Sequence, residues 1–126
     1  MKQILLSFLS LVLFHQLSAQ CTGMGSINYQ QWNNITGGNV SNLTSNVNYP
    51  NNPSVTGTRT SFDMPNNIGN NFGVRMYGYI CPPTTGTYYF WIASDDSGEF
   101  WLSTTNSPAN KVLRASVNGY TGVREW

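Results

Sequence analysis

Histidine is almost absent from this sequence, and its single copy, His15, lies within an N-terminal stretch that resembles an export signal. Lys2 supplies a positive charge, residues 4–14 form an apolar run, and Ala19 ends the stretch on a small residue. Because this run is too short to cross a bilayer as a helix, we expect residues 1–19 to be removed as a signal peptide. The mature chain, residues 20–126, then lacks histidine, which excludes Ser-His-Asp or Cys-His catalysis and histidine-bound zinc within it.

Charged side chains are also scarce and make up 9% of the sequence. Once Lys2 is removed with the signal, five Lys and Arg residues remain against five Asp and Glu residues. A chain with zero net charge and no basic cluster lacks the cationic surface that binds phosphate groups. We therefore expect no nucleic-acid partner.

Cysteine occurs only twice, as Cys21 and Cys81. In an exported chain the two thiols are expected to form one disulfide that ties the N-terminus to the core. Closing so long a loop stabilises the fold by up to about 4 kcal/mol in the chain-entropy model. Two alternatives are a pair of unpaired buried thiols and a lipoprotein acylated at Cys21.

No helical periodicity persists beyond the signal, whereas aromatic and β-branched residues recur between Asn-, Ser- and Gly-rich stretches. About a hundred residues suffice for one domain, which we expect to be all-β, an antiparallel sandwich or barrel of jelly-roll type. Trp32 and Ile35 are expected to close one end of its core. Residues 37–53 are expected to form a surface loop with short turns, anchored by Val40, Leu43 and Val47. The predicted strands are an edge strand or arm at 23–31, a half-buried strand at 72–80, a central strand at 87–94, its hairpin partner at 100–102 and a last strand at 112–115.

The predicted hairpin turns at Asp95-Asp96-Ser97-Gly98. Adjacent residues of a regular strand point to opposite faces, but a turn ended by Gly98 can bring both carboxylates to one ion. Calcium takes about six to eight oxygen ligands, so two carboxylates would fill at most half of its shell. The alternative is that Asp95 or Asp96 caps the turn through a hydrogen bond to its own backbone.

The residues around this turn resemble the central motif of the PA-fourteen domain family, named after the anthrax-toxin protective antigen and found in flocculins, adhesins and glycosidase-appended modules. The motif is carried by Gly78-Tyr79-Ile80, Pro83, Gly86-Thr87-Tyr88, Phe90, Ala93-Ser94-Asp95-Asp96 and Phe100-Trp101-Leu102. Further matches are Trp32-Asn33-Asn34-Ile35, Ser61-Phe62-Asp63 and Val123-Arg124-Glu125-Trp126. The resemblance implies a β-sandwich that commonly binds carbohydrate.

In the sugar-binding branch of that family, the paired aspartates form a cis peptide and coordinate calcium, which binds sugar hydroxyls. The resemblance therefore implies that Asp95 and Asp96 are metal ligands. The family's second ligand loop and its last strands would lie beyond Trp126, so we expect the domain to be incomplete in this chain.

Other polar and aromatic residues suggest weaker hypotheses. Glu99 could form a glycosidase pair with Asp95 or Asp96, but at the start of a strand it is expected to be a solvated rim residue. Trp91 and Trp101 could stack on sugar rings, although aromatics on alternating strands are more often core. Asp63 is expected to cap a turn, and Arg75 either pairs with an acid or extends over the sheet.

Together these patterns predict a noncatalytic, calcium-assisted carbohydrate-binding module of a secreted or cell-surface protein. The alternative is a structural or protein-contact module, without sugar binding of its own, attached to a downstream glycan-active enzyme or adhesin. Any catalysis would belong to a downstream domain. We expect glycans as partners, further domains in the same polypeptide and no membrane span.

Overall fold

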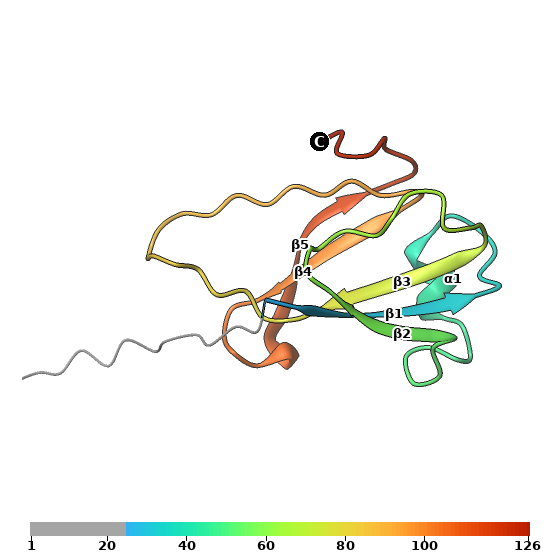
Figure 1. Ribbon diagram of the computed structural model, residues 1–126, viewed down its shortest axis with the longest axis horizontal. Helices are drawn as coiled ribbons and strands as arrows, with labels where there is room; N and C mark the ends of the chain where they lie inside the picture. Colours follow the sequence, from blue (N-terminus) through green and yellow to red (C-terminus); the bar gives the residue numbers. More distant parts are fainter. Residues whose placement is uncertain (1–24) are drawn as a thin grey trace, which may run out of the picture.

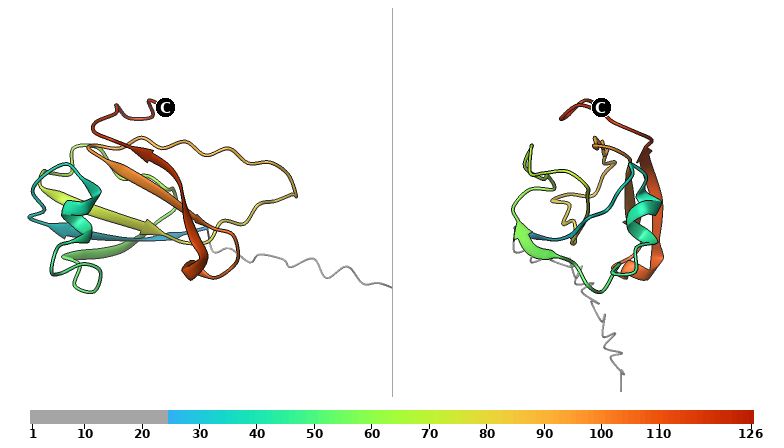
Figure 2. Two further views of the ribbon diagram at one scale, coloured as in Figure 1. Left: turned by 180° about the vertical axis from the view of Figure 1, so that it is seen from behind. Right: turned by 90° about the vertical axis from the view of Figure 1, so that its right-hand side faces the viewer.

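The computed structural model describes residues 25–126, and these form two antiparallel sheets (Figure 1). The predicted all-β antiparallel fold class is therefore confirmed. The elements in chain order are β1 (Ile27–Asn33), α1 (Val40–Thr44), β2 (Val55–Arg59), β3 (Phe72–Tyr77), β4 (Gly98–Ser103), the 3-10 turn η1 (Pro108–Asn110) and β5 (Lys111–Val117). The first sheet has the order β2-β1-β3 and the second pairs β4 with β5. The right-hand view of Figure 2 places β2 and β5 on opposite sides of the molecule.

β1 is the central strand of its sheet, so its prediction as an edge strand is wrong. Gln30 of β1 lies opposite Thr56 of β2 on one side and opposite Arg75 of β3 on the other. β2 was not predicted as a strand, because it contains a single large apolar residue, Val55. Only its pairing with β1 makes this polar segment a strand.

The buried core consists of Trp32, Ile35 and Leu43, and it lies where β1 ends and α1 begins. Trp32 is 1% exposed, donates its indole Nε1–H to the carbonyl oxygen of Asn48 at 3.0 Å, and packs against the ring of Tyr49. The predicted burial of Trp32 and Ile35 is confirmed, although within residues 25–126 they form the buried core rather than close one end of it.

Residues 37–53, predicted as a surface loop with short turns, contain the short helix α1. Leu43 is an apolar anchor as predicted, whereas Val47 is not. Asn39 precedes it in an extended conformation, and the Asn39 N–H donates to Oδ1 of Asn42 at 2.9 Å. This single turn is enough to bury Leu43, whereas Val47, three residues beyond its end, is 92% exposed.

Residues 87–94 do not form the predicted central strand. The chain leaves β3, passes Pro82-Pro83, and runs as a long excursion before it returns to β4 (Figure 1). Within residues 25–126 no strand pairs with this segment, because β4 pairs with β5 instead, with Trp101 opposite Leu113. Phe90 still contacts Phe100 of β4, with ring centroids 5.0 Å apart, but Tyr89 is 75% exposed.

No helix between residues 25 and 126 has the length and apolar content that a membrane crossing requires. The predicted signal peptide, residues 1–19, lies outside the described part of the chain, as does Cys21.

Candidate functional site

The acidic turn immediately precedes β4, and the peptide bond between Asp95 and Asp96 is cis, as the family resemblance implies. Both aspartate side chains are exposed. Within residues 25–126 neither carboxylate accepts a hydrogen bond or forms an ion pair. The alternative that one of them caps the turn is therefore not supported, and both carboxylates are available to a ligand.

The loop before α1 supports one flank of the acidic turn. The N–H of Ser97 donates to the carbonyl oxygen of Gly38 at 3.0 Å. A Cβ on Gly38 would lie 2.6 Å from Oδ2 of Asp96 and 2.9 Å from its Cβ and Cγ. Only glycine therefore allows the Asp96 side chain to lie as it does against this loop.

The segment after β5 supports the other flank. The N–H of Ser94 donates to Oγ1 of Thr121 at 2.8 Å, and the N–H of Thr121 donates back to the carbonyl oxygen of Ser94 at 2.9 Å. The N–H of Gly119 donates to Oγ of Ser97 at 3.1 Å. The turn is thus held by two segments from distant parts of the sequence, while its carboxylates remain exposed.

Glycine at position 98 is required for packing rather than for a left-handed turn. Its φ is not among the positive values of the described glycines, but a Cβ there would lie 2.7 Å from Oγ of Ser94. The two ends of the turn, Ser94 and Gly98, can approach each other only because this side chain is missing.

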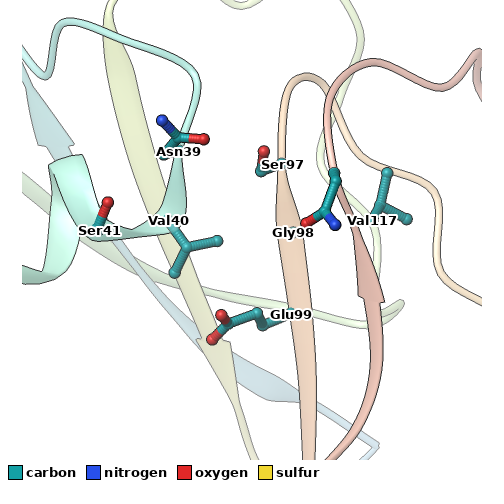
Figure 3. Close-up of a pocket in the computed structure, with 8 residues that line it drawn as sticks. Asn39, Val40, Ser41, Ser97, Gly98, Glu99 and Val117 are labelled. Carbon is teal, nitrogen blue, oxygen red and sulfur yellow. The ribbon is translucent and has the colours of Figure 1, made fainter.

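A pocket of about 220 Å³ opens beside the acidic turn, between α1 and the adjoining ends of β4 and β5 (Figure 3). Figure 3 shows the Glu99 carboxylate directed towards Val40 across this space. Glu99 is held by its neighbour on the same strand face, since the Trp101 Nε1–H donates to its Oε2 at 2.9 Å. The complete lining is Asn39, Val40, Ser41, Ser97, Gly98, Glu99, Val117 and Asn118.

The chemistry of the described carboxylates is limited. Glu99 is exposed, which agrees with a solvated rim residue, and it lines the pocket whereas Asp95 and Asp96 do not. Residues 25–126 contain no group of three or more His, Cys, Asp or Glu side chains that could hold a metal ion. A metal at Asp95 and Asp96 would therefore need its other ligands from carbonyl, amide, water or ligand oxygens.

Three other sequence-based expectations are resolved by the structure. Trp91 and Trp101 are 65% and 46% exposed, so their prediction as core residues is wrong. Trp91 lies in the segment before the turn, which has no partner strand within residues 25–126, whereas Trp101 lies in β4 and is exposed although that strand is paired. The prediction that Asp63 caps a turn is wrong, because within the described residues its carboxylate accepts a hydrogen bond only from Arg124, with which it pairs at 3.2 Å. Arg75 extends over the ring of Tyr77, with its guanidinium carbon 4.8 Å from the ring centroid.

Cys81 is half-buried near the start of the excursion that follows β3. Its expected partner, Cys21, lies outside the described residues, so the disulfide stays a prediction.

Gly38, Gly119 and Thr121 are the site residues that sequence reasoning missed. Ser97 was placed in the turn, but its contacts with Gly38 and Gly119 were not predicted. Gly37-Gly38 is a weak local signal, since paired glycines often mark a close backbone approach. Thr121 has no such signal, because its partner Ser94 lies 27 positions away.

Comparisons with known proteins match this chain to one family and to parts of larger proteins. The model of the PA14 domain, the family that the sequence resembles, matches residues 33–111, which include the acidic turn. A mouse (Mus musculus) protein named N-acetyl-beta-glucosaminyl-glycoprotein 4-beta-N-acetylgalactosaminyltransferase 1 is 38% identical over 102 residues, 81% of this chain and 10% of that protein. Fibrocystin from dog (Canis lupus familiaris) is 33% identical and fibrocystin from mouse is 34% identical, each over 58 residues, 46% of this chain and 1% of each fibrocystin. The chain thus spans about a tenth or less of these relatives. No solved structure matches it significantly.

Proposed function

Because this chain belongs to the PA14 domain family, we propose that it is a noncatalytic carbohydrate-binding module of a secreted or cell-surface protein, in which Asp95 and Asp96 hold calcium. The observation that carries the proposal is the acidic turn. Its two carboxylates are exposed and free of partners within the described residues. Backbone and hydroxyl contacts fix the turn from both flanks and leave these oxygens unused.

The two aspartates fit a hard cation that prefers oxygen ligands. They would contribute about a third to a half of the roughly six to eight oxygens that calcium takes. When bound, calcium supplies coordination positions that sugar hydroxyls can fill. The role of this chain is to hold the two carboxylates in place, through Gly38 beside Asp96 and through the hydrogen bonds of Ser94 and Ser97.

The relatives support the proposal that this chain is a carbohydrate-binding module within a larger protein. The match to the mouse protein covers only 10% of it, and its name describes an enzyme that transfers a sugar to a glycoprotein. A short domain within such a protein is well placed to bind the glycan on which a neighbouring domain acts. The predicted export signal, residues 1–19, agrees with a location outside the cell.

A protein-contact module without sugar binding is the second candidate function. It is favoured by the exposed aromatic side chains of the excursion between β3 and β4, where Tyr79, Tyr89 and Trp91 are 72%, 75% and 65% exposed. Exposed aromatic clusters are typical of contact surfaces between proteins or domains. Such a module would need neither calcium nor the acidic pair.

Calcium binding distinguishes the two functions. We expect calcium at about 100 times its dissociation constant to stabilise the full chain by about 2.7 kcal/mol, measured as a calcium-dependent rise in melting temperature. Retention on a glycan column should likewise require calcium. The double variant Asp95→Asn with Asp96→Asn keeps the shape of both side chains but should abolish both effects.

The matched control is Asp63→Asn, which removes an exposed aspartate that pairs with Arg124 outside the acidic turn. This variant should respond to calcium as the wild type does. If neither calcium stabilisation nor calcium-dependent retention is seen in the wild type, the carbohydrate-binding proposal is wrong and the contact module is favoured.

A further inference from the structure

The pocket beside the acidic turn adjoins the proposed calcium ligands through two chain segments. Ser97 follows Asp96 directly, and Asn39 follows Gly38, against which the Asp96 side chain packs. Both residues line the pocket, and in Figure 3 their side chains face each other across it. A ligand whose hydroxyls reach Asp95 and Asp96 could therefore extend into this space.

The lining combines groups that suit a hydroxyl-rich ring. Asn39 and Asn118 each carry an amide that both donates and accepts hydrogen bonds, and Ser41 carries a hydroxyl that does the same. Val40 and Val117 add apolar surface to the same pocket. Sugar rings carry hydroxyls at their edges and C–H groups on their faces, so a mixed lining of this kind complements them.

The only charge that lines the pocket is negative. Glu99 is its only charged lining residue, and its carboxylate is held by the Trp101 indole rather than by a cation. No Lys or Arg side chain lines the pocket to offset this charge. Calcium held by Asp95 and Asp96 is balanced by their two negative charges, so an acidic ligand placed here would still meet the unneutralised Glu99 carboxylate, which opposes its binding.

We infer that this pocket is a second subsite for the glycan, which accepts an uncharged sugar ring and excludes acidic sugars through Glu99. The inference rests on the proposed function and adds the class of sugar to it. Asn39 and Asn118 bind the ring, and Glu99 selects against carboxylated rings.

The test uses the ¹⁵N-labelled full chain in saturating calcium, titrated with methyl glycosides of galactose, mannose and N-acetylglucosamine, and with glucuronic and N-acetylneuraminic acids. At least one neutral glycoside should shift the side-chain amide signals of Asn39 and Asn118. The amide of Asn106, in the turn after β4, should not move and is the internal control. The acidic sugars should bind at least about tenfold more weakly than the neutral sugar.

Glu99→Gln tests the selection step, because the glutamine carbonyl can still accept the Trp101 hydrogen bond. This variant should bind glucuronic acid about tenfold more tightly than the wild type does, with less than a threefold change for the neutral sugar. Glu125→Gln is the matched control, since Glu125 is exposed and lies outside the pocket, and it should leave both affinities unchanged.

The outcomes separate this inference from the proposed function, since calcium binding is read beforehand from the backbone amides of Asp95 and Asp96 without sugar. Neutral sugars that shift those two signals but leave Asn39 and Asn118 unmoved would overturn the subsite and keep the proposed function. A panel in which no sugar moves any signal, or in which Glu99→Gln does not improve binding of the acidic sugar, would also overturn the subsite. Absence of the calcium response itself would refute the proposed function.

Discussion

Two tryptophans of this chain lie in opposite environments. Trp32 is 1% exposed, with its indole N–H bonded to the Asn48 carbonyl, whereas Trp91 is 65% exposed in the excursion before the acidic turn. Burial of a large aromatic side chain stabilises a fold by several kcal/mol, while an exposed one contributes little. Residue type alone therefore says little about the contribution of each tryptophan to stability.

We predict that Trp32→Ala lowers the free energy of unfolding by about 3–5 kcal/mol, because it leaves a cavity in the core and removes the hydrogen bond that the indole donates to the Asn48 carbonyl. Trp91→Ala, the matched control, should change it by no more than about 0.5 kcal/mol. Urea unfolding followed by far-ultraviolet circular dichroism measures both. Similar losses in the two variants would contradict the core described above.

Gly38 offers a second test at a single position, because its missing side chain leaves room for Asp96. We predict that Gly38→Ala displaces the Asp96 carboxylate and weakens calcium binding about tenfold or more, as substitutions that support a metal ligand typically do. Gly86→Ala is the control, since a Cβ there would meet no atom within 4 Å and its φ is not positive. Isothermal titration with calcium measures the affinities, and equal values for Gly38→Ala and the wild type would contradict the positioning role of Gly38.

The segment that follows β5 stabilises the acidic turn through a side chain and not only through its backbone. Oγ1 of Thr121 accepts the Ser94 N–H at 2.8 Å and also lies 3.2 Å from the Ser94 carbonyl oxygen, to which it can donate. Valine has nearly the shape of threonine but can do neither. Replacing Thr121 by valine therefore tests how much its hydroxyl contributes to holding the acidic turn in place.

We predict that Thr121→Val lowers the free energy of unfolding by about 1 kcal/mol and speeds hydrogen exchange of the Ser94 amide about fivefold, because that N–H loses its acceptor. Thr104→Val, at an exposed position after β4, is the matched control and should change neither quantity. Nuclear magnetic resonance exchange on the folded chain reports the Ser94 amide directly. An unchanged Ser94 rate in Thr121→Val would show that the threonine hydroxyl does not hold the turn.

In the molecule as a whole, the packed side chains lie at one end of the three-stranded sheet, where β1 and α1 bring Trp32 and Leu43 together. Amides of β1 lie between two strands, whereas the excursion from 78 to 97 has no partner strand within residues 25–126. We predict that Gln30 and Gln31 exchange their amide hydrogens slowly and that Tyr89 and Trp91 exchange theirs at nearly the rate of an unfolded chain. Protection at Tyr89 and Trp91 equal to that of β1 would show that another strand pairs with this segment.

The elements that sequence reasoning predicted well have strong local patterns. The alternation that begins at Phe72 predicts β3, although the strand ends at Tyr77 and not at Ile80. β2 was missed because its stability comes from its neighbour: the Tyr29 ring lies over Gly57, where a Cβ would meet Tyr29 Cε1 at 2.6 Å. Residues 87–94 show the converse. Their sequence pattern predicts a strand, but no strand within residues 25–126 pairs with them.

Some residues of the candidate site can likewise be found from the sequence, whereas others cannot. Asp95 and Asp96 are found from the sequence because they are adjacent and sit in a motif that resembles a family. Gly38 and Thr121 are not, because their roles depend on contacts across 58 and 27 positions of the chain. The pocket also escapes prediction, since it joins residues of α1 to those of β4 and β5.

The amino-acid sequence by itself thus determined the all-β class, the burial of Trp32 and the position of the acidic turn, because each follows from composition, spacing or a contiguous motif. The tertiary structure decided which strands pair, that Trp91 and Trp101 are exposed, and that Asp95 and Asp96 keep their carboxylates free. These properties depend on which distant segments come into contact. A backbone hydrogen bond such as that from Ser97 to Gly38 exists only in the folded chain.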